Sequence, residues 1–147
     1  MKNVLIIREG TIDEVVQLSK QIPEFINPHQ ALEYQQRLSN VPHLILVACD
    51  ANLPVGFKVG YQRASDGTFY SWMGAVLPAY RHKEVATQLA HQQETWAKQQ
   101  GYTHIRFKTR NRLKGMLIFA LKNGFDIIRV EHQPTREEHR IVLEKRL

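Results

Sequence analysis

Hydrophobic and polar positions follow two different periods along the chain, and these periods predict where strands and helices lie. Val55, Phe57, Val59 and Tyr61 occupy every second position of one segment, which predicts a strand with these four side chains on one face. Residues 43–49 are continuously apolar, which is typical of a strand buried on both faces. In chain order, the expected strands are residues 4–8, 43–49, 55–62, 68–76, 103–109, 125–130 and 139–145.

Helical spacing of apolar residues begins immediately after the first expected strand. Thr11 and Glu14 form the pattern of a capping box, in which each side chain bonds the other residue's backbone N–H, and Pro23 ends this helix. A second, short helix is expected to start at Asn27 and Pro28, because Asn is a good cap and Pro fits the first helical position.

Two later helices are each expected to end at a glycine. Residues 84–100 stop before Gly101, and residues 112–123 stop before Gly124, which is typical of helices that close with a left-handed glycine. The inner face of the last helix is expected to carry Leu113, Met116, Leu117, Ala120 and Leu121.

The resulting order of elements is β-α-α-β-β-β-α-β-α-β-β. Strands that alternate with helices in the second half indicate a mixed sheet with helices on its faces. Neither a repeat nor a linker interrupts the chain, so residues 1–147 are expected to form one domain. Ligands of such sheets bind at the carboxyl ends of strands, where neighbouring strands diverge.

Composition narrows the class of protein. Hydrophobic residues make up 43% of the 147 residues, and no apolar run approaches the length of a membrane span. The apolar N-terminal run is too short for a signal peptide, so a soluble cytoplasmic protein without membrane association is expected. Cys49 is the single cysteine and is read as a small buried hydrophobic residue. The seven histidines are scattered, and no metal site is expected.

Charge favours an anionic partner. The formal net charge is +6, which suits nucleic acid, anionic lipid or a phosphorylated cofactor. Arg81, His82 and Lys83 form one basic cluster, which leads directly into a helix whose first turn has unpaired N–H groups. A second cluster has a basic residue at every second position, and its alternative interpretation is a solvated basic face. Its members are Arg106, Lys108, Arg110, Arg112 and Lys114.

The first cluster lies in a recognisable motif. Residues 76–86 read V-L-P-A-Y-R-H-K-E-V-A. They resemble the motif V-x-P-x-[YF]-R-x-x-G-[IV]-[AG] of the GNAT superfamily of acyl-CoA-dependent N-acetyltransferases. Residues 101–111 resemble the fifth strand of that superfamily, and residues 111–125 resemble its last helix with the recurrent G-F. The resemblance implies an α/β (α+β) fold with a mixed central sheet of about seven strands, splayed between the fourth and fifth, and helices on both faces.

The resemblance also implies the site. Acetyl-CoA, as co-substrate, would lie in the splay, with its pantetheine arm paired to backbone groups at Ala75 and Val76. Asn111 and Lys114 would approach it from the next strand, so that the two basic clusters meet at one cleft. Glu24 and Phe25 would border the acceptor. The diphosphate would lie against Arg81, His82, Lys83, Glu84, Val85, Ala86 and Thr87.

Two positions depart from the family pattern. Glu84 replaces the motif glycine, and its charge is expected to weaken acetyl-CoA binding relative to glycine. Ala120 replaces a tyrosine that many members use as general acid on the departing thiolate. No general base is identified: Tyr70, Ser71 and Glu33 are read as structural or substrate-contacting residues.

Three functions follow from these observations. The first is transfer of an acetyl group to a primary amine by direct attack in a ternary complex, without a metal. The second is a GNAT-like sensor domain that is weakly active or inactive. The third is nucleic-acid binding through the basic strand, although no aromatic residues interleave with its bases. The amine acceptor, a small molecule or peptide, is not identified, and a homodimer is in keeping with the superfamily.

Overall fold

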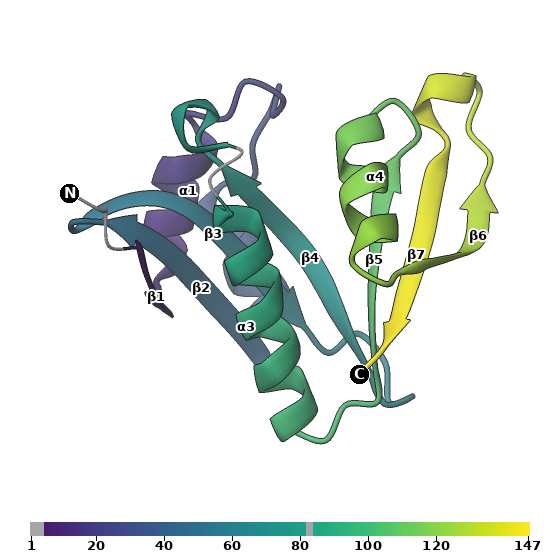
Figure 1. The fold of residues 1–147 in the computed structure, drawn as a ribbon, viewed down its shortest axis with the longest axis horizontal. Coiled ribbons are helices and arrows are strands. Elements are labelled where there is room, and N and C mark those ends of the chain that lie inside the picture. Colours follow the sequence, from purple (N-terminus) through teal and green to yellow (C-terminus); the bar gives the residue numbers. More distant parts are fainter. Residues whose placement is uncertain (1–4, 82–83) are drawn as a thin grey trace.

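The computed structural model describes residues 5–81 and 84–147, which form one mixed sheet flanked by helices (Figure 1). Its strands, in the spatial order β1-β2-β3-β4-β5-β7-β6, are β1 (Leu5–Glu9), β2 (His43–Asp50), β3 (Leu53–Tyr61), β4 (Thr68–Val76), β5 (His104–Arg110), β6 (Asp126–Glu131) and β7 (Arg140–Arg146). The helices are α1 (Ile12–Ser19), α2 (Ala31–Leu38), α3 (Val85–Gln99) and α4 (Lys114–Lys122), with short 3-10 turns η1 (Pro78–Tyr80) and η2 (Arg136–Glu138). The predicted single-domain α/β (α+β) fold is confirmed.

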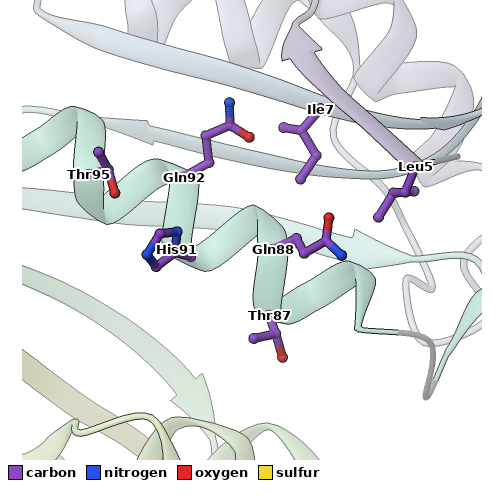
Figure 2. Close-up of a pocket in the computed structure, with 7 residues that line it drawn as sticks. All are labelled: Leu5, Ile7, Thr87, Gln88, His91, Gln92 and Thr95. Carbon is purple, nitrogen blue, oxygen red and sulfur yellow. The ribbon is translucent and has the colours of Figure 1, made fainter.

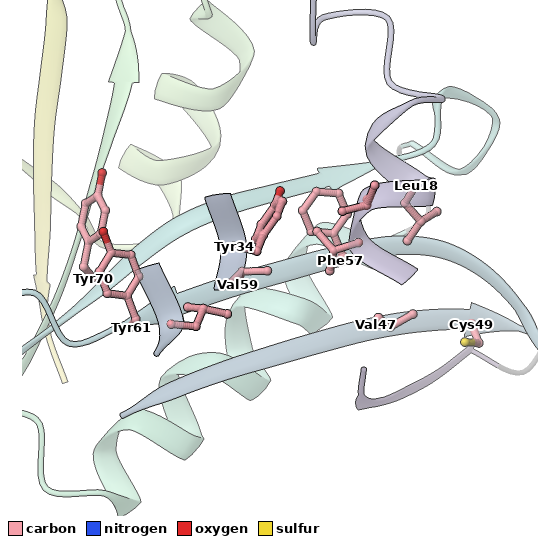
Figure 3. Packing of buried hydrophobic residues seen from close by; sticks show 11 residues of the cluster. Leu18, Tyr34, Val47, Cys49, Phe57, Val59, Tyr61 and Tyr70 are labelled. Carbon is pink, nitrogen blue, oxygen red and sulfur yellow. The ribbon is translucent and has the colours of Figure 1, made fainter. Parts of the chain in front are cut away.

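Helices cover both faces of the sheet. α1 and α2 pack on one face, where Tyr34 and Phe57 belong to the buried cluster shown in Figure 3. α3 packs on the other face, with Leu89 against Ile105 of β5 among its buried neighbours. α4 lies on the same face as α3, because Phe107, two residues beyond Ile105 on β5, packs beneath it.

The sheet opens between β4 and β5, as predicted (Figure 1). Among the strands formed by the described residues, these two form the one parallel pair, and their pairing is short. The register joins Thr68, Phe69 and Tyr70 to His104, Ile105 and Arg106. β4 runs on to Val76 without further β5 partners, whereas β5 stays paired with β7 along its whole length. The two halves of the sheet therefore diverge towards the carboxyl ends of β4 and β5.

The capping box at the start of α1 and the glycines that close α3 and α4 are confirmed, whereas α1 ends at Ser19, before the predicted end at Pro23. Thr11 accepts a hydrogen bond from the Glu14 backbone N–H at 3.2 Å, and the Glu14 carboxylate accepts one from the Thr11 N–H at 3.1 Å. Gly101 and Gly124 follow α3 and α4 with φ of 95° and 89°. Each adopts the left-handed conformation that closes a helix.

The predicted start of the second helix is wrong. α2 begins at Ala31, and Gln30 is its N-cap without a side-chain capping bond. His29 instead packs its ring against Trp72, with centroids 5.4 Å apart, and against Tyr34 at 6.1 Å. His29 is therefore held by contacts with two aromatic side chains, one of them on β4, which override the local capping signal.

The predicted common face of β3 is also wrong at one position. Ala48 pairs with Gly56 and Cys49 pairs with Pro54, so Val55 is an inserted residue in a β-bulge. Val55 consequently packs beneath α3, while Phe57 and the alternate residues after it pack beneath α1 and α2. Alternation in a sequence does not reveal an inserted residue, because the period continues unchanged through it.

The predicted inner face of α4 is only partly buried. Ala120 is 1% exposed, and Leu117 is partly buried against the same small cluster. Met116 and Leu121 are 41% and 49% exposed. α4 packs with Phe125 against residues of β5 and β7 on its own side of the opening, and this surface covers one stripe of the helix (Figure 1).

The structure bears on two features of the sequence, the single cysteine and the length of its apolar segments. Cys49 is buried in the cluster beneath α1 and α2, as predicted. In the described ranges 5–81 and 84–147, no helix has both the length and the apolar character that crossing a membrane requires.

Candidate active site

Beyond Tyr70, one edge of β4 faces the opening. The other edge remains paired with β3 as far as Val76. An unpaired strand edge presents backbone N–H and C=O groups that an extended ligand can bond as an added strand would. Ala75 and Val76 lie on this stretch, Ala75 packed towards α1 and α2 and Val76 towards α3. The structure therefore leaves an unpaired strand edge at the two residues that the family resemblance assigned to the pantetheine arm.

The first turn of α3 follows the basic loop. Glu84 is the N-cap, with φ 64° and ψ 8°, and its side chain makes no capping hydrogen bond. The turn holds no acidic residue, and Ala86 and Thr87 are exposed in it, so its N–H groups suit an anion. Val85 is buried, and its Cγ1 lies 3.2 Å from where a Cβ on Gly56 would stand. This close approach holds the start of α3 against β3.

Arg81 is joined to a residue for which the sequence predicted a different role. Its guanidinium donates two hydrogen bonds to the Glu24 carboxylate, at 2.8 and 2.9 Å, and its Nε donates to the Val76 carbonyl at 3.1 Å. The hydrogen bonds from Arg81 hold the pKa of the Glu24 carboxyl below its usual range. The hydroxyl of the preceding residue, Tyr80, donates to Asp50 Oδ2 at 3.0 Å. These hydrogen bonds fix the first part of the basic loop, at residues 80 and 81. His82 and Lys83 lie outside the described residues.

The basic side chains of β5 are matched by carboxylates. Arg106 donates to Glu144 at 2.6 Å, and the Lys108 amine lies 3.4 Å from Glu131. Arg110 and Arg112 both pair with Glu138, at 3.8 and 3.0 Å. Alternation places Arg106, Lys108 and Arg110 on the sheet face opposite Phe107, and hence opposite α4. Their carboxylate partners lie on β7, β6 and η2, while β5 itself forms the second edge of the opening.

Asn111 and Lys114 contact each other at the carboxyl end of β5. The Lys114 amine donates to Asn111 Oδ1 at 2.9 Å, and Asn111 Nδ2 donates to the Arg136 carbonyl at 3.2 Å. The Asn111 backbone N–H donates to the His139 carbonyl at 2.8 Å. Asn111 thus ties the end of β5 to the segment around η2, and it does not cap α4, whose N-cap is Leu113.

An aromatic group lies on the α1 and α2 side of β4. Ser71 and Met73 pair with consecutive β3 residues, so Trp72 is an inserted residue in a bulge. Its ring lies 5.0 Å from that of Tyr34 and 5.6 Å from that of Tyr61, and the Arg37 guanidinium is 4.6 Å from its centroid. Phe25 packs against the same cluster. This side of the opening is therefore walled by aromatic side chains.

The sequence prediction missed a lysine on the α3 side of β4. Lys58 of β3 stands opposite Gly74 of β4 in the sheet register. Its Cγ and Nζ lie 3.5 and 3.6 Å from the position a Cβ on Gly74 would take, so the side chain extends across β4. Burial lowers the pKa of the Lys58 amine to about 8, an effect that the charge of Glu94 opposes. A lysine within the apolar alternation of residues 55–61 was the signal available in the sequence.

A separate groove of about 580 Å³ runs between β1 and α3 (Figure 2). Leu5 and Ile7 form its apolar wall, opposite polar residues of α3 such as Gln88 and Gln92. Thr87, in the first turn of α3, also lines the groove (Figure 2). The groove does not include the edge of β4. Within ranges 5–81 and 84–147, no three His, Cys, Asp or Glu side chains are grouped closely enough to hold a metal ion.

Several solved structures share this fold, and two of the three described here are named N-acetyltransferases. The ribosomal-protein-S18-alanine N-acetyltransferase of Escherichia coli superposes with a TM-score of 0.83 at 11% identity, over 97% of this chain and 94% of that one. Ard1 of Thermoplasma volcanium gives 0.82 at 16% identity, over 97% of each chain. The PaiA N-acetyltransferase of Thermoplasma acidophilum, solved in complex with coenzyme A, gives 0.76 at 17% identity, over 98% and 99%.

Comparison of sequences identifies the family. None of the curated proteins matches the chain. The model of the acetyltransferase (GNAT) family, however, matches residues 12–125, which include the opening, the basic loop and the helices on both faces. The chain therefore belongs to the GNAT acetyltransferase family.

Proposed function

We propose that the protein is an N-acetyltransferase that moves an acetyl group from acetyl-CoA to a primary amine by direct attack in a ternary complex. The observation that carries this proposal is the opening of the sheet after Tyr70, with the start of α3 beside it. A carrier with an extended amide-containing arm and a diphosphate needs both a free strand edge and an anion site. Family membership makes acetyl-CoA the expected carrier.

The residues around the opening fit such a co-substrate. Backbone groups of Ala75 and Val76 would bond its arm, and the N–H groups at Val85, Ala86 and Thr87 would bind the diphosphate. Arg81 is already bonded to Glu24, so its role is to hold the loop, with its charge nearby. His82 and Lys83, the next residues in the sequence, would supply basic side chains, and Asn111 and Lys114 would approach from the β5 side.

The acceptor amine would enter from the α1 and α2 side, past Trp72 and Phe25. A deprotonated amine in good alignment attacks a thioester without a covalent enzyme intermediate, and a backbone N–H of β4 can polarise the carbonyl. Glu24 stays beside this entrance, but its carboxylate is engaged by Arg81. The acceptor class is a small-molecule or peptide amine, and we expect neither a metal, a membrane nor nucleic acid to take part.

Two observations keep a second function in view, that of an acyl-CoA-binding sensor with little or no activity. Glu84 brings a negative charge to the anion site, and Ala120 supplies no proton to a departing thiolate. A nucleic-acid-binding role, by contrast, has lost its main support, because Arg106, Lys108, Arg110 and Arg112 already pair with carboxylates.

The test is a titration of acetyl-CoA monitored by heat and by thermal unfolding, followed by a thiol-release assay. Transferase activity predicts binding, a raised unfolding temperature and free thiol with at least one amine in a panel. The panel should include polyamines, free amino acids and a peptide that begins with alanine, since the name of the Escherichia coli relative specifies an alanine of a ribosomal protein. Binding without thiol release would support the sensor.

Failure to bind acetyl-CoA, together with steeply salt-dependent binding to DNA, would overturn the proposal in favour of the nucleic-acid function. We also expect the protein to be cytoplasmic and to form a homodimer. Light scattering on the purified chain would test the dimer.

A further inference from the structure

Lys58 lies where a side chain can reach the opening from inside the sheet. Its strand, β3, is internal, and a lysine on the α3 face there would ordinarily be covered by neighbouring side chains. Gly74 has no side chain, so Lys58 extends over it, with Nζ 3.6 Å from the place of the missing Cβ. Gly74 directly precedes the edge residues Ala75 and Val76 and has no β5 partner. The amine is thus carried across β4 towards the unpaired edge.

The amine has no bonded partner in the described part of the chain. It forms no hydrogen bond or ion pair with another described residue, and the charge of Glu94 acts on it only through space. Glu94 of α3 instead accepts from Lys145 of β7 at 2.7 Å. In the sheet register, Lys58 lies between two uncharged residues, Leu46 of β2 and Gly74 of β4. Gln93 of α3 packs over Gly60, two residues further along β3. Both polar atoms of the buried Gln93 amide also lack a partner.

A half-buried ammonium without a counter-ion is costly, so it is retained only where something else compensates that cost. A departing thiolate in the opening would be such a compensating charge. The helix residue that many family members would use to protonate it is Ala120 here, 1% exposed and without any proton to give. An ordinary thiol has a pKa of about 8.5, close to that of this amine, which is about 8, and proton transfer is efficient between groups so matched.

We propose that Lys58 is the proton donor to the sulfur of the departing coenzyme A, in place of the tyrosine that Ala120 replaces. This inference rests on the proposed transferase function. The acceptor nitrogen forms its bond to the acetyl carbon, the carbon–sulfur bond breaks, and its electron pair stays on sulfur. Lys58 gives that sulfur a proton and becomes a neutral amine. The proton lost by the acceptor nitrogen returns to Lys58 through water, so the enzyme is restored.

The first test needs no acceptor. Free coenzyme A is bound to the wild type, to Lys58→Met and to Lys122→Met, and its thiol is titrated by the ultraviolet absorbance of the thiolate. An ammonium beside sulfur stabilises the thiolate, so the bound thiol should titrate about one pH unit lower in the wild type than in Lys58→Met. Lys122→Met makes the same change at an exposed lysine of α4 and should match the wild type.

The second test uses the pH profile of acetyl transfer to hydroxylamine. The wild-type rate should fall as Lys58 loses its proton above about pH 8, and this alkaline limb should be missing in Lys58→Met. Lys58→Gln serves if the Met variant does not fold. Equal thiol titrations in wild type and Lys58→Met, with coenzyme A bound to both, would overturn the inference. So would acetylation of Lys58 itself, seen as a mass increase on that residue. Absence of coenzyme A binding in all variants would overturn the proposed function, and this inference with it.

Discussion

Glu84 occupies a left-handed backbone conformation at the N-cap of α3, with φ 64°. Such a conformation costs a non-glycine residue about 1–2 kcal/mol. Glycine removes this strain, but part of the gain in stability is lost because glycine also gives the unfolded chain more conformational freedom. Glu84→Gly should therefore raise the free energy of unfolding by about 0.5–1 kcal/mol, measured by urea denaturation. It should also bind acetyl-CoA more tightly, because it removes a negative charge beside the diphosphate.

Glu84→Gln separates these two effects. Glutamine keeps the backbone strain and the size of the side chain but removes the charge. We expect several-fold tighter acetyl-CoA binding than in the wild type, with the free energy of unfolding unchanged within about 0.5 kcal/mol. Unchanged affinity in both variants would mean that the Glu84 carboxylate points away from the bound co-substrate.

Single residues also mark the limit of what the sequence could predict about the site. The motif at residues 76–86 located the loop and the start of α3, because local patterns determine local conformation. The Arg81–Glu24 pair could not be predicted, since these residues are far apart in sequence and no local pattern links them. Lys58 was missed for the same reason: its reach across β4 depends on Gly74 of another strand.

At the scale of elements, two glycines give a matched test of backbone conformation. Gly101 closes α3 with φ 95°, and a Cβ there would meet nothing within 4 Å. Gly101→Ala should thus lower the free energy of unfolding by about 1 kcal/mol through backbone strain alone. Gly115 is the second residue of α4, with equally open space around it, and Gly115→Ala should raise that free energy by about 0.5 kcal/mol. Chemical denaturation should show these opposite signs; a shared sign would contradict the assigned conformations.

Elements were predicted well where one local cause decides them. β4 was predicted with its observed bounds, because an apolar run before a proline leaves little choice. The start of α2 and the sheet face of Val55 were predicted wrongly. The contact of His29 with the ring of Trp72 determines the first, and a β-bulge determines the second. The exposed side of α4 reflects the opening itself, which leaves this helix less of the sheet to cover.

At the scale of the whole molecule, charge pairing and burial make stability depend on pH in two separate windows. Hydrogen bonds from Arg8 and Arg81 lower the pKa values of Glu14 and Glu24, so the unfolded chain binds more protons than the folded one below about pH 4.5. Stability is then lost as pH falls through that range. The lowered pKa of Lys58, about 8 against an ordinary 10.5, has the same sign at alkaline pH. The unfolded chain again binds more protons, so stability rises from about pH 8 towards pH 10.

Thermal unfolding of the wild type and of Lys58→Met across pH 6–10 isolates the second window. Holding Lys58 charged costs up to about 3 kcal/mol if the whole pKa shift is counted, and less with its partial exposure. Lys58→Met should be the more stable protein at pH 7, and its advantage should shrink as pH rises, because the wild-type amine becomes neutral in the fold. Above pH 10 both proteins should lose stability, since burial raises the pKa of Tyr34 and the unfolded tyrosine ionises first. A constant difference between the two proteins from pH 7 to pH 10 would mean that the Lys58 amine keeps an ordinary pKa and is hydrated, and it would then be too weak an acid to match a thiol.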